Sequence, residues 1–239
     1  MLALLLLTAA LALTEEPYQQ GVALFEKGHY AEAAPLLAEA ARRDPKNAQK
    51  WKALGVALAA QKKYAEATEP LRRACELNPE LPDACYYFAR NEYAQNRFEI
   101  SIQTLKRLLK SDPQPARIYL ALAQNYEGLA LAQEAERHFR EALRSNSDRS
   151  RLAGDFDPRL HYGLFLIRAG RASEAIPYLR ECVQDSPRHV QSRIELARAL
   201  LYAGKPAEAA EHLNAVLAMA PENVQARVLL QRARAALEP

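Results

Sequence analysis

Histidine and cysteine are the side chains with which this sequence could do chemistry, and it has few of them. No pair of histidines forms the His-Glu-x-x-His motif of zinc hydrolases, and no glycine-rich phosphate loop is present. No Cys–His or Ser–His–Asp arrangement is indicated by the positions His29, His138, His161, His189 and His212. The inventory therefore predicts a protein that is not an enzyme and has no catalytic, metal-binding or cofactor-binding residues.

Three aspartates, Asp148, Asp155 and Asp157, lie close together and could in principle hold a cation. Their spacing does not match that of a calcium-binding loop. Asp157 is followed by Pro158, a pair that is typical of a helix start. We therefore expect these aspartates to serve a turn and a helix cap.

The three cysteines are Cys75, Cys85 and Cys182, and an odd number does not suggest a complete disulfide framework. Cys75 and Cys85 flank the dipeptide Asn78-Pro79 and are the pair to consider if the protein is exported. The preferred interpretation is that all three are small apolar residues packed between helices.

The composition favours helices and gives no sign of a nucleic-acid partner. Alanine and leucine dominate and there are only 8 glycines, as expected for a helical chain. Charged residues make up 26% of the sequence, for a net charge of +3, with lysine and arginine scattered along the chain. Nucleic-acid-binding proteins usually concentrate basic residues on one face.

A proline recurs at a fixed interval, at Pro45, Pro79, Pro113, Pro187 and Pro221. The first three are 34 residues apart, and so are the last two. The remaining interval is 74 residues, or two periods plus six, so one repeat and a six-residue insertion lie within it. Proline ends a helix because it lacks an N–H group and clashes with the preceding turn. The sequence thus predicts six repeats.

Numbering each repeat so that this proline is position 32 places small residues at positions 8 and 20 of all six. Position 24 is always large and apolar: Leu37, Leu71, Leu105, Phe139, Leu179 and Leu213. Position 8 reads Gly21, Gly55, Ala89, Ala123, Gly163 and Ala197. Two antiparallel helices can approach closely only where side chains are small, so each repeat should be a pair of packed helices.

These residues resemble the tetratricopeptide repeat family, whose 34-residue period and small/large pattern they match. The second repeat is most similar to the family pattern, with Trp51, Leu54, Gly55, Leu58, Tyr64, Ala67, Leu71, Ala74 and Pro79 at its positions. The resemblance covers residues 14–221. It implies an all-α fold, a right-handed α-solenoid of about six units with a C-terminal capping helix, and a role in binding proteins.

The expected organisation follows from this register. Residues 14–147 form repeats one to four, 148–155 an insertion, 156–223 repeats five and six, and 224–239 the capping helix. Glu92 stands at a normally apolar position, so we expect it to be paired with an arginine or open to solvent.

Residues 1–13 carry no charge and include the small-x-small pattern Ala10-Leu11-Ala12. The stretch is too short to span a bilayer, which takes about 20 apolar residues, and no lysine or arginine precedes it. We interpret it as a signal-like segment of an exported, periplasmic bacterial protein, which would bring the chain close to a membrane. The alternative is a helix that packs on the first repeat of a cytoplasmic protein.

By the same resemblance, positions 2, 5, 9, 12 and 13 of each first helix should face a concave groove that binds a protein or peptide. Tyr86, Arg90 and Tyr93 stand at these positions of one helix, with Tyr87 close by, and tyrosine and arginine often carry interface energy. The other candidates are Tyr18, Lys52, Arg117, Gln124, Leu160, Leu164, Ile167, Arg168, Ile194, Arg198 and Tyr202. Packing of the superhelix could bury the apolar members instead.

The favoured function is a non-catalytic scaffold whose groove binds a protein or peptide. The Lys/Asn carboxylate clamp of one family sub-type is absent, because Val56 stands where the asparagine would follow Lys52. The alternative is a structural or oligomerising subunit of a bacterial envelope assembly, such as pilus biogenesis.

Overall fold

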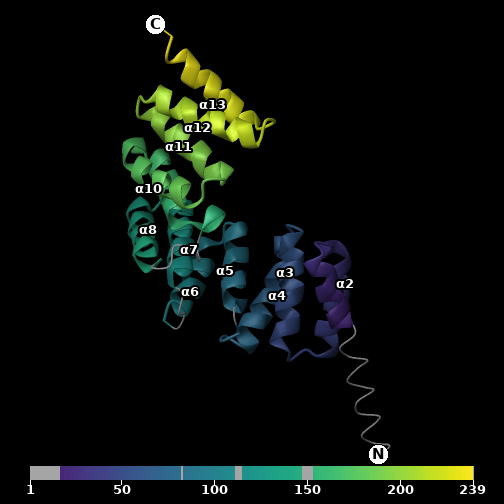
Figure 1. Ribbon diagram of the computed structural model, residues 1–239. Helices are drawn as coiled ribbons and strands as arrows, with labels where there is room; N and C mark the ends of the chain where they lie inside the picture. The colour runs from purple at the N-terminus through teal and green to yellow at the C-terminus, as the bar shows by residue number, and fades with distance from the viewer. Residues whose placement is uncertain (1–16, 82, 111–114, 147–152, 239) are drawn as a thin grey trace, which may run out of the picture. The chain divides into compact units, whose positions relative to one another are not determined.

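The computed structural model describes residues 17–81, 83–110, 115–146 and 153–238 (Figure 1). The signal-like segment at 1–13 and most of the insertion at 148–155 lie outside these residues. The described residues are helical and contain no strand. Residues 17–26 are helical and precede α2 (Tyr30–Arg43), α3 (Ala48–Ala60), α4 (Tyr64–Leu77), α5 (Ala84–Ala94), α6 (Phe98–Leu108), α7 (Pro115–Gly128), α8 (Ala132–Ser145), η1 (Gly154–Phe156), α9 (Pro158–Arg168), α10 (Ala172–Asp185), α11 (Val190–Tyr202), α12 (Pro206–Met219) and α13 (Val224–Ala235).

The chain divides into two compact units, residues 1–112 and 113–239. In the first unit α2 to α6 pack each on the next along the chain. In the second unit α7 to α13 do the same, and α11 also contacts α9 and α13 (Figure 1). Each unit is therefore a stack of helix-turn-helix repeats, which confirms the predicted all-α fold. The segment boundaries expected from the sequence stay a prediction.

The small and large positions of the repeat meet inside each helix pair. A Cβ atom added to Gly55 would lie 2.5 Å from Cγ of Leu71, and one added to Gly163 would lie 2.7 Å from Cγ of Leu179. Such distances are shorter than any ordinary van der Waals contact. The residues at positions 20 and 24 are fully buried in all six repeats. The sequence predicts this close contact between positions 8 and 20. In these two repeats the atoms nearest to position 8 belong instead to the large residue at position 24.

Two local predictions from the sequence are also confirmed. Glu92 is 1% exposed. It is paired rather than open to solvent, since Arg97 Nη1 lies 3.5 Å from its Oε2 and the Thr68 hydroxyl donates to its Oε1 at 3.4 Å. Asp157 caps α9 by accepting a hydrogen bond from the backbone N–H of Arg159 at 2.9 Å.

The preferred interpretation of the cysteines is wrong for two of them, because Cys75 and Cys85 form a disulfide. The turn between α4 and α5 brings their Cα atoms to 4.6 Å, within the range that a disulfide spans. Cys182 alone fits the packing interpretation. It is a buried thiol, and burial raises its pKa well above the usual value, which makes it unreactive.

The disulfide lies at the start of α5, where this helix lacks the side-chain cap that begins comparable helices. The first helices α3, α9 and α11 and the C-terminal helix α13 each begin with a side chain that caps the helix, namely Asn47, Asp157, His189 and Asn223. Asp83 precedes α5 in the left-handed region, at φ 66°, and its side chain makes no capping hydrogen bond. The bond to Cys85 therefore holds the first turn of α5 to α4 in place of a cap.

We predict that Cys75→Ser with Cys85→Ser lowers the free energy of unfolding by about 2–4 kcal/mol, because the bond restricts the unfolded chain. Urea unfolding with and without dithiothreitol measures this. The reductant should destabilise the wild type and leave the double variant unchanged. A wild type that is insensitive to the reductant would contradict the prediction.

Candidate protein-binding surface

On the first helix of every repeat, the residues at positions 9, 12 and 13 are at least partly accessible to solvent. Residues at position 13 are exposed: Glu26, Ala60, Ala94, Gly128, Arg168 and Tyr202. Residues at position 9 are half-buried: Val22, Val56, Arg90, Gln124, Leu164 and Arg198. Residues at position 12 are half-buried as well: Phe25, Ala59, Tyr93, Glu127, Ile167 and Leu201. Each unit therefore presents a continuous set of side chains on one side of its first helices.

Two of the predicted apolar groove residues are not accessible. Leu160 is 2% exposed and Ile194 is 1% exposed, so neither can line a surface that meets a partner. Both stand at position 5, as does Leu120, which is buried as well. We attribute this to packing between neighbouring first helices, since α7 contacts α9 and α9 contacts α11. For Leu160 and Ile194, the alternative considered from the sequence therefore holds: packing of the superhelix buries them.

In the first unit the Tyr/Arg cluster lies on α5. Tyr86 and Tyr87 meet edge to face, with ring centroids 6.4 Å apart. Cζ of Arg90 lies 5.1 Å from the ring centroid of Tyr93, and that ring lies 5.7 Å from Phe98. Such contacts hold the rings in place before any partner binds. The other two candidates of this unit, Tyr18 and Lys52, are half-buried on the first helices of repeats one and two.

In the second unit four of the predicted residues line one open cleft of about 610 Å³. They are Ile167 and Arg168 from the end of α9 and Arg198 and Tyr202 from α11, and the lining is completed by Gly170, Ala172 and Ser173. Of the remaining candidates, Leu164 is half-buried on α9, while Arg117 and Gln124 are half-buried on α7. The structure thus brings four of the unit's candidates together at the α9–α11 end, and the others do not line this cleft.

Both arginines of this cleft are held by carboxylates. Nη2 of Arg168 lies 2.6 Å from Oε1 of Glu127 on α7, and Nη1 of Arg198 lies 3.0 Å from Oε2 of Glu195. Glu195 is 2% exposed, and burial raises its pKa although Arg198, Gln191 and Arg168 act to lower it. Glu195 is not among the residues predicted from the sequence. Its one signal was an acidic residue three positions before Arg198 on the same helix.

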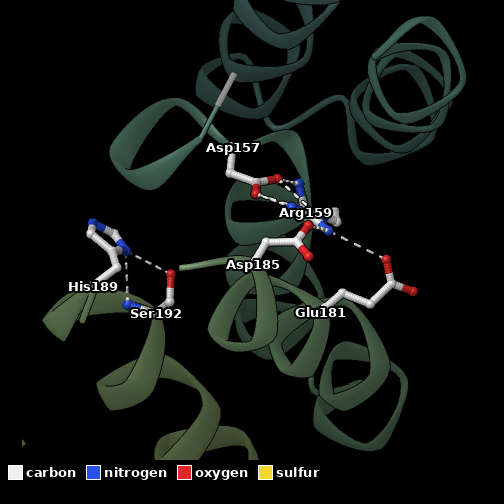
Figure 2. A network of polar contacts seen from close by, with 6 residues as sticks. All are labelled: Asp157, Arg159, Glu181, Asp185, His189 and Ser192. Carbon is white, nitrogen blue, oxygen red and sulfur yellow. Dashed lines mark hydrogen bonds and ion pairs between the residues drawn. The ribbon is translucent and has the colours of Figure 1, made fainter. Parts of the chain in front are cut away.

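A second polar network in the same unit is centred on a buried arginine and a buried aspartate, and reaches two acidic side chains that are partly exposed. Arg159, 5% exposed, stands at a repeat position that is usually large and apolar. Its Nη2 lies 2.6 Å from Asp157 Oδ2, and its Nη1 lies 2.7 Å from Asp185 Oδ2 and 3.4 Å from Glu181 Oε2. Figure 2 shows Arg159 reaching from the start of α9 toward the acidic residues of α10. We interpret this network as structural.

The described residues offer no metal centre, since no group of three or more histidine, cysteine, aspartate or glutamate side chains could hold an ion. Over the same residues, no helix has the length and apolar character needed to cross a membrane.

Family models decide what kind of protein this is. One model, described as tetratricopeptide repeat, matches residues 18–82 and 120–189, and a second with the same description matches residues 58–124 and 166–232. The chain belongs to the tetratricopeptide repeat family. The tetratricopeptide repeat is an interaction scaffold, which agrees with the accessible residues at positions 9, 12 and 13 of the first helices.

Solved structures agree on the fold of this tetratricopeptide repeat protein. It is similar to PilW, a widely conserved type IV pilus biogenesis factor, with a TM-score of 0.77 and 16% identity over 91% of this chain and 98% of that one. It is similar to Pseudomonas aeruginosa pilF, with a TM-score of 0.70 and 19% identity over 93% and 96% of the two chains. Against the APC/C hetero-tetramer Cut9-Hcn1 the TM-score is 0.70 at 18% identity, and this chain, 89% of which is covered, spans 41% of that one.

We predict that Arg159→Leu destabilises the second unit by about 3–5 kcal/mol, because it leaves Asp157 buried without its counter-ion. Chemical denaturation measures the change. Arg188→Leu, at an exposed arginine of the same unit, should shift stability by less than about 0.5 kcal/mol. Equal unfolding midpoints for the two variants would show that the network contributes nothing.

We predict that Glu195→Gln is more stable than the wild type at neutral pH. Burial raises the folded-state pKa of Glu195 above its ordinary value of 4.5. A raised carboxyl pKa contributes stability below the unfolded-state pKa, and this contribution is lost as pH rises through the folded-state pKa. The advantage of the variant should therefore shrink as the pH falls to about 4.

Thermal unfolding across this pH range measures the difference. Glu174→Gln serves as the control, because hydrogen bonds from Arg171 lower the pKa of that exposed carboxyl and its replacement should bring no gain. An advantage of Glu195→Gln that grows toward low pH would refute the assignment.

Proposed function

We propose that this protein is a non-catalytic scaffold that binds partner proteins through the accessible residues at positions 9, 12 and 13 of its first helices and the residues beside them. The observation that carries the proposal is the cleft between α9 and α11, where four side chains selected from the repeat register line one hollow. The Tyr/Arg cluster of α5 is a second contact region, in the other unit. Tyrosine and arginine are the residues that most often dominate binding energy.

The geometry suits binding because the contact residues are held in advance. In the first unit, an edge-to-face contact holds Tyr86 and Tyr87, a cation–π contact holds Arg90 and Tyr93, and the Cys75–Cys85 disulfide ties down the start of their helix. In the second unit, Glu127 and Glu195 orient the two arginines. A surface that is ordered before binding avoids part of the entropy loss of association.

We propose further that the protein works in an oxidising compartment of the bacterial envelope. Disulfides persist in exported proteins and are rare in the cytosol, so the Cys75–Cys85 bond favours export. Two similar structures, PilW and pilF, carry pilus-related descriptions, which supports a role in an envelope assembly as the second candidate function. Light scattering separates that candidate, because a protein that stays monomeric at all concentrations does not self-assemble.

We predict that Tyr86→Ala with Arg90→Ala weakens capture of partner proteins from an extract of the producing cells by about tenfold or more. Quantitative mass spectrometry of the captured proteins measures this. Ile100→Ala with Arg107→Ala is the matched control, since both residues are exposed on α6, the second helix of the same repeat.

The control should retain the partners, and all proteins should unfold at similar temperatures. If the two variants capture the same partners in the same amounts as the wild type, the cluster on α5 is not a binding surface.

A further inference from the structure

We propose that the cleft between α9 and α11 binds an acidic segment of the partner, with a side-chain carboxylate on Arg168 and Arg198 and an apolar neighbour on Ile167 and Tyr202. This inference rests on the proposed scaffold function and names the chemistry of its partner.

The residues that line the cleft are complementary to such a segment. Two of the seven are arginines and none is acidic. A guanidinium binds a carboxylate through paired, charge-assisted hydrogen bonds, which are among the stronger contacts between side chains. Beside the arginines, Tyr202 is 58% exposed and Ile167 is half-buried, so an apolar surface adjoins the cationic one.

The arginines are anchored in a way that leaves donors for a ligand. Arg168 directs Nε and Nη2 to a single oxygen of Glu127, at 2.8 and 2.6 Å. Arg198 directs Nη1 to Glu195 at 3.0 Å. A guanidinium carries five N–H donors in a planar fork, so both side chains keep hydrogen-bonding capacity beyond these anchors. Both also lower the pKa of Glu195, which places them within electrostatic reach of the same carboxylate.

Glu195 is the independent sign that this arrangement serves binding. Its buried Oε2 makes no hydrogen bond within the described residues, and its close charged neighbour is Arg198. Its other oxygen, Oε1, accepts a hydrogen bond from Gln191 Nε2 at 2.6 Å. A buried carboxylate whose close counter-ion is a single, partly exposed arginine is still an expensive way to stabilise a helix stack. Its position is explained if Glu195 holds the guanidinium of Arg198 at the wall of the cleft.

The charge distribution favours a carboxylate over a polyanion. Two arginines line the cleft, and each forms an ion pair with a carboxylate, Glu127 or Glu195, that is not among the lining residues. An anionic membrane or a nucleic acid is bound by many uncompensated cations spread over a face. A single carboxylate requires only one fork and a neighbouring apolar contact.

The probe is a fluorescent, acetylated and amidated heptapeptide in which glutamate and leucine alternate, with a glutamine-for-glutamate version as its uncharged match. In fluorescence anisotropy we expect the acidic peptide to bind about tenfold tighter than its match. The preference should fall as salt rises from about 50 to 500 mM, since salt screens exposed charges.

Arg168→Gln and Arg198→Gln should each abolish most of this preference. Because Arg198→Gln leaves Glu195 buried without its partner, Arg198→Gln with Glu195→Gln is made as well, which removes both charges. Arg188→Gln is the matched control, an exposed arginine of the same unit outside the cleft, and should bind like the wild type. Thermal unfolding verifies that each variant is folded.

Three results would overturn the inference: equal binding of the two peptides, a preference that survives both arginine substitutions, or binding to phosphatidylglycerol vesicles that the acidic peptide does not displace. Tyr202→Ala distinguishes failure of this inference from failure of the proposed scaffold function. If Tyr202→Ala loses captured partners while the arginine variants keep them, the cleft binds partners without acidic chemistry. If neither Tyr202→Ala nor Tyr86→Ala with Arg90→Ala loses partners, the proposed function itself fails.

Discussion

The close approach of the two helices within each repeat is the constraint on which the rest of the structure depends. Gly55 has no room for a Cβ atom against Leu71, and Gly163 has none against Leu179. This contact sets the distance between the helices, and the fully buried residues at positions 20 and 24 complete it. Because the same contact recurs, the residues at positions 9, 12 and 13 of every first helix face away from its partner helix. The accessible surface is therefore a consequence of the core.

Packing between repeats then decides how much of this helix face a partner can reach. In the second unit the contacts of α9 and α11 accompany the burial of Leu160 and Ile194, whereas Ile167 and Tyr202 stay accessible farther along the same helices. The accessible residues converge on one cleft instead of forming a uniform stripe. A helix face is thus divided by its neighbours into a structural part and a part that can bind.

Buried charged residues of the repeats are accommodated in three different ways. Arg159 is buried among several acidic groups and closes the start of α9 against α10. Glu92 is buried but reaches Arg97, whose side chain is partly in solvent. Glu195 is buried and anchors Arg198 at an accessible cleft. The last two each place a buried carboxylate against an arginine that solvent can reach, so burial of one partner does not show that a charge pair is purely structural.

The sequence by itself determined the repeat, its period and its helical fold, because the 34-residue spacing of proline and the small/large pattern are local consequences of helix packing. It also identified Ile167, Arg168, Arg198 and Tyr202 as candidates, since they stand at positions 9, 12 and 13 of the first helices. Only the tertiary structure decided that Leu160 and Ile194 are core, that Cys75 and Cys85 are bonded, and that Glu195 lies beside Arg198 under the cleft wall. These facts depend on contacts between helices, and a repeat register, which describes each helix alone, does not contain them.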